Sequence, residues 1–366
     1  MAHIYVFSPS SAVRDKAAFR RGIKRLQAMG HEVEVDEAAL ASHMRFAGDD
    51  VSRIAAVARA AASGADIALI SRGGYGLTRI LPGLPYKAIA KAIDSGTQFV
   101  GLSDFTAFNQ AVLAKTGLIT WQGPALGEDF GPQTEPDDIT LACFEDLVAE
   151  QGEGAGWQRP KAEATLQVRV TDAVLWGGNL SVLVSLLGTP YFPPIDKGVL
   201  FLEDVGEHPY RIERMLTQLL HAGVLARQKA VVLGQFTNFK LVPTHDKGFK
   251  LSTVVGWLRS QIKPPVVTGL PFGHVPTKVL LPVGAKVDLF TDERDALMVW
   301  GHILSVCPRT LARHGSRLAT SIERTRSGDA AGAGAHPGPQ AASHQVTQVP
   351  QLHHAPVATM GNLDLI

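Results

Sequence analysis

Short apolar runs alternate with amphipathic stretches through the first half of the chain. The apolar run His3–Phe7 predicts a strand, and the basic amphipathic stretch Asp15–Met29 predicts a helix that ends at Gly30, a residue that commonly stops helices. The same alternation predicts strands at Glu32–Val35, Ile67–Ile70, Gln98–Leu102 and Leu118–Trp121, with helices at Ser52–Ala62 and Thr106–Lys115. Strands that interleave with helices at this spacing indicate an α/β fold with a mostly parallel sheet covered on both faces.

The second half of the chain has a mixed pattern. A polar, Gly-containing stretch, Glu150–Lys161, separates the halves, and Pro160 disfavours a continuous helix across it. After it, Ala164–Val170 alternates like a strand, and a helix is expected at Tyr210–His221. Further strands are predicted at Gly198–Leu202 and Lys229–Leu233, followed by late antiparallel strands at Val279–Leu281, Lys286–Phe290 and Ala296–Trp300. This lobe therefore combines α and β elements.

A chain of 366 residues exceeds the usual size of one domain, so we expect two lobes. The boundaries predicted from the pattern are 1–150 for the first lobe, 151–163 for a linker and 164–305 for the second lobe. Residues 306–366 are rich in Ala, Gly, Pro, Gln and His and have few aromatic residues. Such a composition buries too little apolar surface to offset chain entropy, so we expect a disordered tail.

Charge and cysteine content narrow the class of protein. The formal net charge is +1, from 35 basic and 34 acidic side chains, so no global field would attract nucleic acid or a membrane. The two cysteines, Cys143 and Cys307, are typical of reduced thiols. The first residues lack the pattern of a signal peptide, and no apolar run approaches the roughly 20 residues that span a bilayer. We therefore expect a cytoplasmic protein without membrane or nucleic-acid partners.

The first chemical motif follows the predicted strand Gln98–Leu102. Ser103 and Asp104 stand between this strand and the next helix, where a side chain is exposed and backbone N–H groups are unpaired. This is the setting of a nucleophile elbow, although Phe105 replaces the last glycine of GxSxG. The alternative is that Ser103 or Asp104 only caps the helix.

The second motif is Arg72–Gly76 (RGGYG), directly after the predicted strand Ile67–Ile70. Paired glycines at the end of a parallel strand let backbone approach a ligand closely, so they could supply an oxyanion N–H or cradle a phosphate. No Walker or GxGxxG spacing is present. A plain glycine turn remains the alternative.

The third motif is acidic and follows the predicted strand Gly198–Leu202. Glu203 could orient a histidine and stabilise its imidazolium. The alternative is that these acids favour the positive end of the next helix, which accounts for Asp204 and Glu207 better than for Glu203.

A single histidine lies in a rigid loop, Gly269–Pro276 (GLPFGHVP). Among the 13 histidines, His274 is the one framed by loop-fixing Gly and Pro residues, although loop histidines are more often structural. The chain order Ser103, Glu203, His274 matches one known triad architecture.

Other chemistries have weaker signals. No HExxH or paired CxxC motif occurs, and His353-His354 in the tail is at most an adventitious metal site. The basic stretch Arg309–Arg326 indicates a solvated helix or tail more than a nucleic-acid site.

These segments together resemble the LD-carboxypeptidase (muramoyltetrapeptide carboxypeptidase) family of serine peptidases. Each motif alone is unspecific, whereas the ordered set, spread over residues 3–300, is highly specific. The matching pieces are SRGGYG (Ser71–Gly76), GLSD (Gly101–Asp104), WQGP (Trp121–Pro124), WGGNL (Trp176–Leu180), LFLEDVGEHPYRIERML (Leu200–Leu216) and GLPFGH (Gly269–His274).

The resemblance implies a role for particular residues. Ser103 corresponds to the nucleophile, Glu203 to the triad glutamate and His274 to the base. The backbone N–H groups of Gly74 and Asp104 correspond to the oxyanion hole. No metal or organic cofactor is implied. A carboxypeptidase must also bind a free carboxylate, for which Arg72 and Asn179 are the candidates.

The resemblance also implies a fold and a substrate. The fold is a Rossmann-like N-terminal lobe and a C-terminal lobe with a β-barrel-like sheet, and a homodimer is expected. The expected reaction releases the terminal D-alanine of a murein tetrapeptide during cell-wall recycling. Two alternatives remain open: a peptidase similar to the microcin C immunity proteins, which would cleave peptidyl or aminoacyl-nucleotides, and a non-catalytic binding protein for small ligands.

Overall fold

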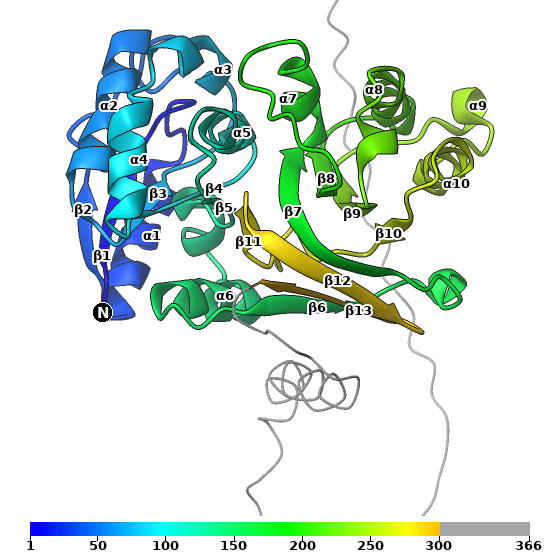
Figure 1. Cartoon of the computed structure of the whole chain (residues 1–366). Coiled ribbons are helices and arrows are strands. Elements are labelled where there is room, and N and C mark those ends of the chain that lie inside the picture. Colours follow the sequence, from blue (N-terminus) through cyan, green and yellow to red (C-terminus); the bar gives the residue numbers. More distant parts are fainter. Residues whose placement is uncertain (301–366) are drawn as a thin grey trace, which may run out of the picture. The chain divides into compact units, whose positions relative to one another are not determined.

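The computed structural model describes residues 1–300, which form two β-sheets with helices packed on them (Figure 1). A parallel sheet in the first half and a mixed sheet in the second confirm the predicted fold class. The predicted tail at 306–366, Cys307 and His353-His354 lie outside the described residues.

The first sheet has the strand order β11-β5-β4-β3-β1-β2. Its five N-terminal strands pair in parallel, and β11 joins the edge antiparallel to β5. The strands are β1 (His3–Phe7), β2 (Glu32–Val35), β3 (Ile67–Ile70), β4 (Gln98–Gly101), β5 (Thr120–Gln122) and β11 (Leu281–Val283).

Alternation along β1 explains why helices cover both faces of this sheet. Tyr5 and Phe7 pack in one apolar cluster with residues of α2, α4 and α5, whereas Ile4 and Val6 pack in another with α1 and α6. Successive strand side chains point to opposite faces, so both faces of the parallel sheet are buried. The helical segments are α1 (Lys16–Ala28), α2 (Asp50–Ala62), α3 (Leu77–Ile80), α4 (Tyr86–Asp94), α5 (Phe105–Thr116), the π-helical turn η2 (Leu126–Phe130) and α6 (Asp138–Val148).

The second sheet has the strand order β10-β9-β8-β7-β12-β13-β6. The strands β7 to β10 pair in parallel, and the remaining pairs are antiparallel. The strands are β6 (Gly154–Gln158), β7 (Arg169–Asn179), β8 (Val199–Val205), β9 (Ala230–Thr237), β10 (Val266–Thr268), β12 (Lys286–Asp292) and β13 (Asp295–Trp300). The helices of this half are α7 (Leu180–Ser185), α8 (Pro209–His221), α9 (Pro243–Asp246) and α10 (Leu251–Gln261).

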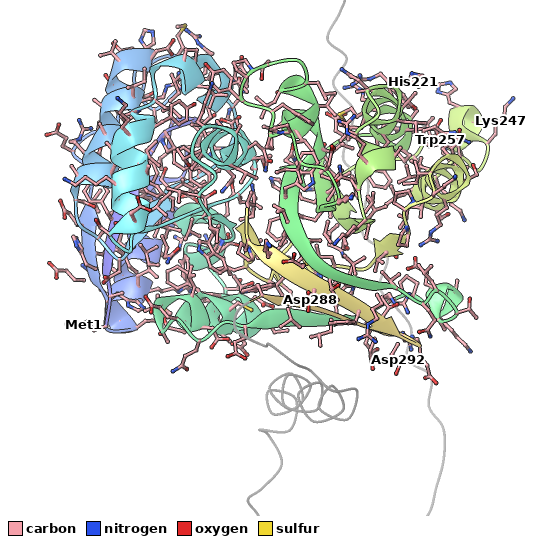
Figure 2. The ribbon with its side chains drawn as sticks, viewed as in Figure 1. Met1, His221, Lys247, Trp257, Asp288 and Asp292 are labelled. Carbon is pink, nitrogen blue, oxygen red and sulfur yellow. The ribbon has the colours of Figure 1, made fainter. Side chains whose placement is uncertain are left out.

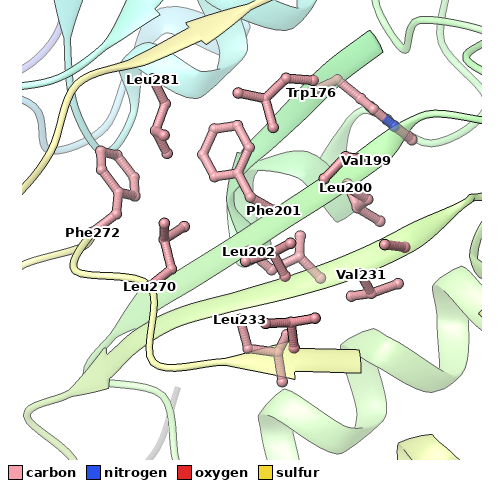
Figure 3. Packing of buried hydrophobic residues seen from close by; sticks show 14 of the residues in the cluster. Trp176, Val199, Leu200, Phe201, Leu202, Val231, Leu233, Leu270, Phe272 and Leu281 are labelled. Carbon is pink, nitrogen blue, oxygen red and sulfur yellow. The ribbon is translucent and has the colours of Figure 1, made fainter. Parts of the chain in front are cut away.

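The core of the second half gathers around β8 and the loop before β11 (Figure 3). The rings of Phe201 and Phe272 meet edge to face with centroids 5.6 Å apart. Leu281 of β11 belongs to this cluster, and so does Leu102, which follows β4 of the first sheet. The apolar core is therefore continuous from one sheet to the other.

Three segments differ from the sequence expectations. Residues 154–158, expected in the linker, form the edge strand β6, and Gly154 lets its backbone lie close to β13, since a Cβ there would be 2.6 Å from the Met298 carbonyl oxygen. The strand expected at Ala164–Val170 runs instead from Arg169 to Asn179. The segment expected to join the second sheet near Val279 becomes β11 and completes the first sheet.

Charged side chains such as Lys247 and Asp292 point outward at the ends of α9 and β12 (Figure 2). Within residues 1–300, no helix combines the length and apolar character needed to cross a membrane.

Candidate active site

Ser103 stands at the sharp turn between β4 and α5. Its φ is +67°, a left-handed conformation that costs energy for any residue with a Cβ. Gly73 makes room for it, because a Cβ at that glycine would lie 2.6 Å from the Ser103 Cβ. A strained serine between a parallel strand and a helix has the backbone of a nucleophile elbow.

The side chain of Asp104, directly before α5, is buried and does not bond the backbone N–H groups at the start of that helix. Its carboxylate accepts hydrogen bonds from the Ser10 hydroxyl and from the backbone N–H of Leu77, the latter at 2.8 Å. Burial raises the pKa of this carboxyl, and the hydrogen bonds oppose that rise. The side chain makes no capping bond to α5, so the geometry does not favour the reading of Asp104 as a helix cap.

The RGGYG turn lies against the Ser103 turn. Gly74 has a φ of +107°, and a Cβ there would meet the Ser11 hydroxyl at 2.3 Å. That hydroxyl accepts the Tyr75 N–H at 2.9 Å. The backbone N–H groups of Gly74 and Asp104 have no protein acceptor within residues 1–300. Two unpaired backbone donors, in two turns that meet where Gly73 contacts Ser103, suit an oxyanion.

Arg72 extends from the same turn, and its guanidinium donates to the Ala12 carbonyl at 3.1 Å. Burial lowers the pKa of Arg72, and the charges of Arg14 and Arg45 lower it further, whereas Glu128 acts in the opposite direction. None of these three arginines forms an ion pair in the described part of the chain. Their positive charge is therefore available to an anionic group.

Glu203 and His274 are in direct contact. The His274 Nδ1 lies 2.8 Å from the Glu203 Oε2, and the Glu203 side chain is fully buried. Burial alone would lower the pKa of His274, but the hydrogen bond and the negative charge of Glu203 outweigh it and raise the pKa. The β8–β9 pairing shifts register between Leu202 and Asp204, so Glu203 stands at an irregularity that can redirect its side chain.

Asn179 holds the other oxygen of Glu203. Its amide nitrogen donates to the Glu203 Oε1 at 3.1 Å and to the Asp204 Oδ1 at 3.0 Å, while its oxygen accepts the Val182 N–H. Both amide hydrogens of this buried side chain are thus engaged. The Asn179 amide therefore fixes the positions of both acids. The assignment of Arg72 or Asn179 to a substrate carboxylate stays a prediction.

Asp204 does not lie at the N-terminal end of α8, where the sequence analysis places it as an alternative. Its carboxylate accepts the Ser181 N–H at 2.9 Å, at the start of α7, and not an N–H of α8, the next helix along the chain. Burial raises the pKa of Asp204 to about 6, with the nearby Glu203 charge adding to the rise. The N-cap of α8 is His208.

The structure thus unites Glu203 with His274, and Ser103 with the RGGYG turn. Within the described residues, the Ser103 hydroxyl makes no hydrogen bond to His274. The charge of Glu128 raises the pKa of Arg72, in the RGGYG turn, and also that of His274, in the Glu203–His274 pair. A pocket of about 300 Å³ beside His274 is lined in part by Glu128 and Lys278.

Sequence reasoning missed the buried polar residues that lie between these groups, above all Thr106 and Gln122. A signal was present: Thr106, Asn109 and Gln110 follow the i, i+3, i+4 spacing of one helix face, although α5 is buried on all sides near its start. Within residues 1–300, no group of three or more His, Cys, Asp or Glu side chains is arranged to hold a metal ion.

Comparison with known proteins gives matches along most of the described chain. Residues 4–123 match the family model of the LD-carboxypeptidase N-terminal domain, and residues 172–289 match that of the LD-carboxypeptidase C-terminal domain. A Bacillus subtilis (strain 168) protein named probable murein peptide carboxypeptidase is 31% identical over 278 residues, which are 75% of this chain and 85% of that protein.

Two further matches bear on substrate. The crystal structure of muramoyltetrapeptide carboxypeptidase from Oxalobacter formigenes has a TM-score of 0.73 and 39% identity, covering 82% of this chain and 98% of that one. The Escherichia coli microcin C7 self-immunity protein MccF is 28% identical over 248 residues, which are 61% of this chain and 70% of that protein.

Proposed function

The chain belongs to the LD-carboxypeptidase family and is a peptide hydrolase, and we propose that it releases the terminal D-alanine of a murein tetrapeptide with Ser103, His274 and Glu203 as its catalytic triad. The observation that carries this proposal is the buried 2.8 Å contact between His274 and Glu203. A buried carboxylate is costly unless it is paired, and this one is paired with an imidazole whose second nitrogen is free to act as a base.

The proposed mechanism follows from which ring nitrogen is used. Since Nδ1 of His274 is held by Glu203, Nε2 takes the proton of Ser103 as its oxygen attacks the scissile carbonyl carbon. Glu203 stabilises the imidazolium that forms. The imidazolium then protonates the nitrogen of the departing D-alanine, and water hydrolyses the acyl-enzyme by the reverse use of the same base.

The oxyanion that forms in this reaction needs donors. The unpaired N–H groups of Gly74 and Asp104 support their assignment to this role. In comparable sites, one such donor contributes about 3–4 kcal/mol to transition-state stabilisation. Gly74 has a positive φ, which suits glycine, and the Asp104 N–H follows Ser103, whose positive φ is strained. Both donors therefore depend on an unusual backbone conformation.

The substrate's terminal carboxylate needs a cation. Arg72 is the candidate, with Arg14 and Arg45 near enough to lower its pKa. Within residues 1–300 these three arginines form no ion pair, and their like charges, which lower the pKa of Arg72, favour an anionic substrate group. Arg72 pairs well with a carboxylate, since a guanidinium can donate two parallel hydrogen bonds.

A second candidate function is cleavage of peptidyl or aminoacyl-nucleotides, favoured by the 28% identity to MccF. The alternative of a non-catalytic binding protein is set aside, because the chain belongs to a family of peptide hydrolases. The homodimer, the cytoplasmic location and the division into lobes at 1–150 and 164–305 stay predictions.

The decisive experiment measures D-alanine released from purified murein tetrapeptide. We expect release by the wild type and none by Ser103→Ala. Ser185→Ala is the matched control, because Ser185 is exposed on α7 and its hydroxyl donates to the Val182 carbonyl. Release that survives Ser103→Ala would refute the triad. A wild type that is inactive on tetrapeptide but cleaves a peptidyl-nucleotide would favour the second candidate.

A further inference from the structure

We infer that Thr106 is a positioning residue that fixes the Ser103 turn of the first sheet against the Glu203–His274 pair of the second. This inference rests on the proposed triad. Thr106 lies in the first turn of α5, and its backbone N–H donates to the Ser103 carbonyl at 2.9 Å. Its side chain is fully buried and points to the other half of the molecule, where it meets the end of β7.

The Thr106 hydroxyl oxygen receives two hydrogen bonds. The backbone N–H of Asn179 donates to it at 3.0 Å, and the side-chain amide of Gln122 donates at 2.9 Å. Gln122 stands at the end of β5 and also bonds the Asn109 oxygen at 2.8 Å. All four of these side chains are buried, so each lost bond would leave a polar group without water to replace it.

Asn179 carries the connection to the proposed base. Its backbone N–H is held by Thr106, while its side-chain amide holds the Glu203 Oε1 at 3.1 Å. The opposite oxygen of Glu203 binds His274. A continuous series of hydrogen bonds therefore runs from the Ser103 carbonyl through Thr106, Asn179 and Glu203 to the imidazole of His274.

Glycine at position 178 makes this approach feasible. Gly178 has a φ of +131°, and a Cβ there would lie 2.6 Å from the Thr106 hydroxyl oxygen and 3.0 Å from the Gln122 amide nitrogen. The neighbouring Gly177 carbonyl accepts the Gln110 side-chain amide at 2.6 Å. The end of β7 is thus shaped to lie directly on α5, and α5 begins at the proposed nucleophile.

The contact of α5 with β7 bears on the distance between the proposed nucleophile and the proposed base. Ser103 follows β4 of the first sheet, whereas His274 lies in the loop after β10 of the second and is held by Glu203 of β8. Within residues 1–300 no hydrogen bond joins Ser103 to His274, so their separation depends on how α5 packs on β7. Reaction rates are sensitive to such placement, and a misplacement of about 1 Å can cost about 100-fold. A change at Thr106 should therefore slow the chemical step without weakening substrate binding.

The test compares three full-length variants with the wild type on murein tetrapeptide. Thr106→Val keeps the shape but removes the acceptor, and Thr106→Ser keeps the acceptor. Thr291→Val is the matched control. Thr291 lies in β12, outside the proposed site, and its buried hydroxyl also accepts a backbone N–H, from Val168 at 2.8 Å. Thermal unfolding is measured for each protein.

For T106V we expect kcat to fall about 10- to 100-fold with KM unchanged within about twofold, as misplacement of reacting groups predicts. T106S should restore kcat to within a few-fold of wild type, and T291V should lose similar thermal stability yet keep its kcat. Equal kcat in T106V and wild type, or no rescue by serine, would overturn the inference. If T106V does not fold, T106C replaces it with the same expectation, because a thiol is a weak acceptor.

A second readout separates this inference from the substrate assignment. The rate at which a fluorophosphonate labels Ser103, followed by mass spectrometry, requires the nucleophile and base but no peptide recognition. A wild type that is labelled but releases no D-alanine would contradict the proposed substrate, and the labelling rates of T106V, T106S and T291V would then decide the positioning role. A wild type that is neither labelled nor active would refute both.

Discussion

Replacing Glu203 with glutamine tests the proposed triad most sharply, because the structure dictates how the introduced amide must lie. Asn179 donates to the Oε1 position at 3.1 Å, so the amide oxygen has to occupy that position. The amide nitrogen then faces the Nδ1 of His274, where the carboxylate oxygen Oε2 lay at 2.8 Å. Since that nitrogen is a donor, Nδ1 must become an acceptor, and the ring proton moves to Nε2.

An imidazole protonated at Nε2 cannot accept the proton of Ser103. The comparable Asp-to-Asn change in a Ser-His-Asp protease lowers kcat by about 10⁴, and we expect a loss of that order here. At 1.36 kcal/mol for each factor of ten, this is about 5 kcal/mol of transition-state stabilisation. KM should change little, because Glu203 is fully buried.

The assay measures kcat and KM for D-alanine release at constant pH, alongside thermal unfolding. Glu163→Gln is the matched control: Glu163 is also buried and paired, with Arg259 at 2.7 Å, but belongs to no proposed site. We expect E163Q to lose stability while keeping its kcat. A Glu203→Gln variant that keeps kcat within about tenfold of wild type would refute the tautomer reasoning.

Four further outcomes are expected. Because the pKa of His274 is raised above 6.5 and its neutral form is the base, the acid limb of kcat/KM should have its midpoint above pH 6.5; a midpoint below that value would contradict the pairing with Glu203. The charged pair should also stabilise the fold fully below pH 6.5 and lose that effect as the pH rises through the raised pKa, which urea unfolding of wild type against His274→Gln would measure. Gly178→Ala should destabilise the protein by about 2–5 kcal/mol through strain and overpacking against Thr106, whereas Gly256→Ala in α10, where a Cβ meets nothing within 4 Å, should be neutral or stabilising in the same unfolding assay. Arg72→Gln should raise KM for the tetrapeptide at least about tenfold with a smaller effect on kcat, and an unchanged KM would exclude Arg72 as the carboxylate ligand.

Local sequence patterns determined much of the first sheet. The strands β1, β2 and β3 were predicted with the bounds that the structure has, since each is a short run with apolar or alternating character bounded by polar or glycine residues. The same patterns placed Ser103 at a strand-to-helix turn and Glu203 directly after a predicted strand, which in the structure continues to Val205. These are properties of neighbouring residues, so a single sequence contains them.

Only the tertiary structure decided which distant segments meet. No local pattern distinguishes β11 as an edge of the first sheet from a strand of the second, because pairing with β5 depends on partners more than 150 residues away in the chain. The role of Asn179 is similar: alone it is a polar residue after two glycines, and only the pairing of β7 with β8 places it opposite Glu203. Thr106 likewise differs from other helix residues only because β7 lies on it. The sequence by itself singled out Ser103, Glu203 and His274 as candidates, and the packing of one half on the other decided which neighbours hold them.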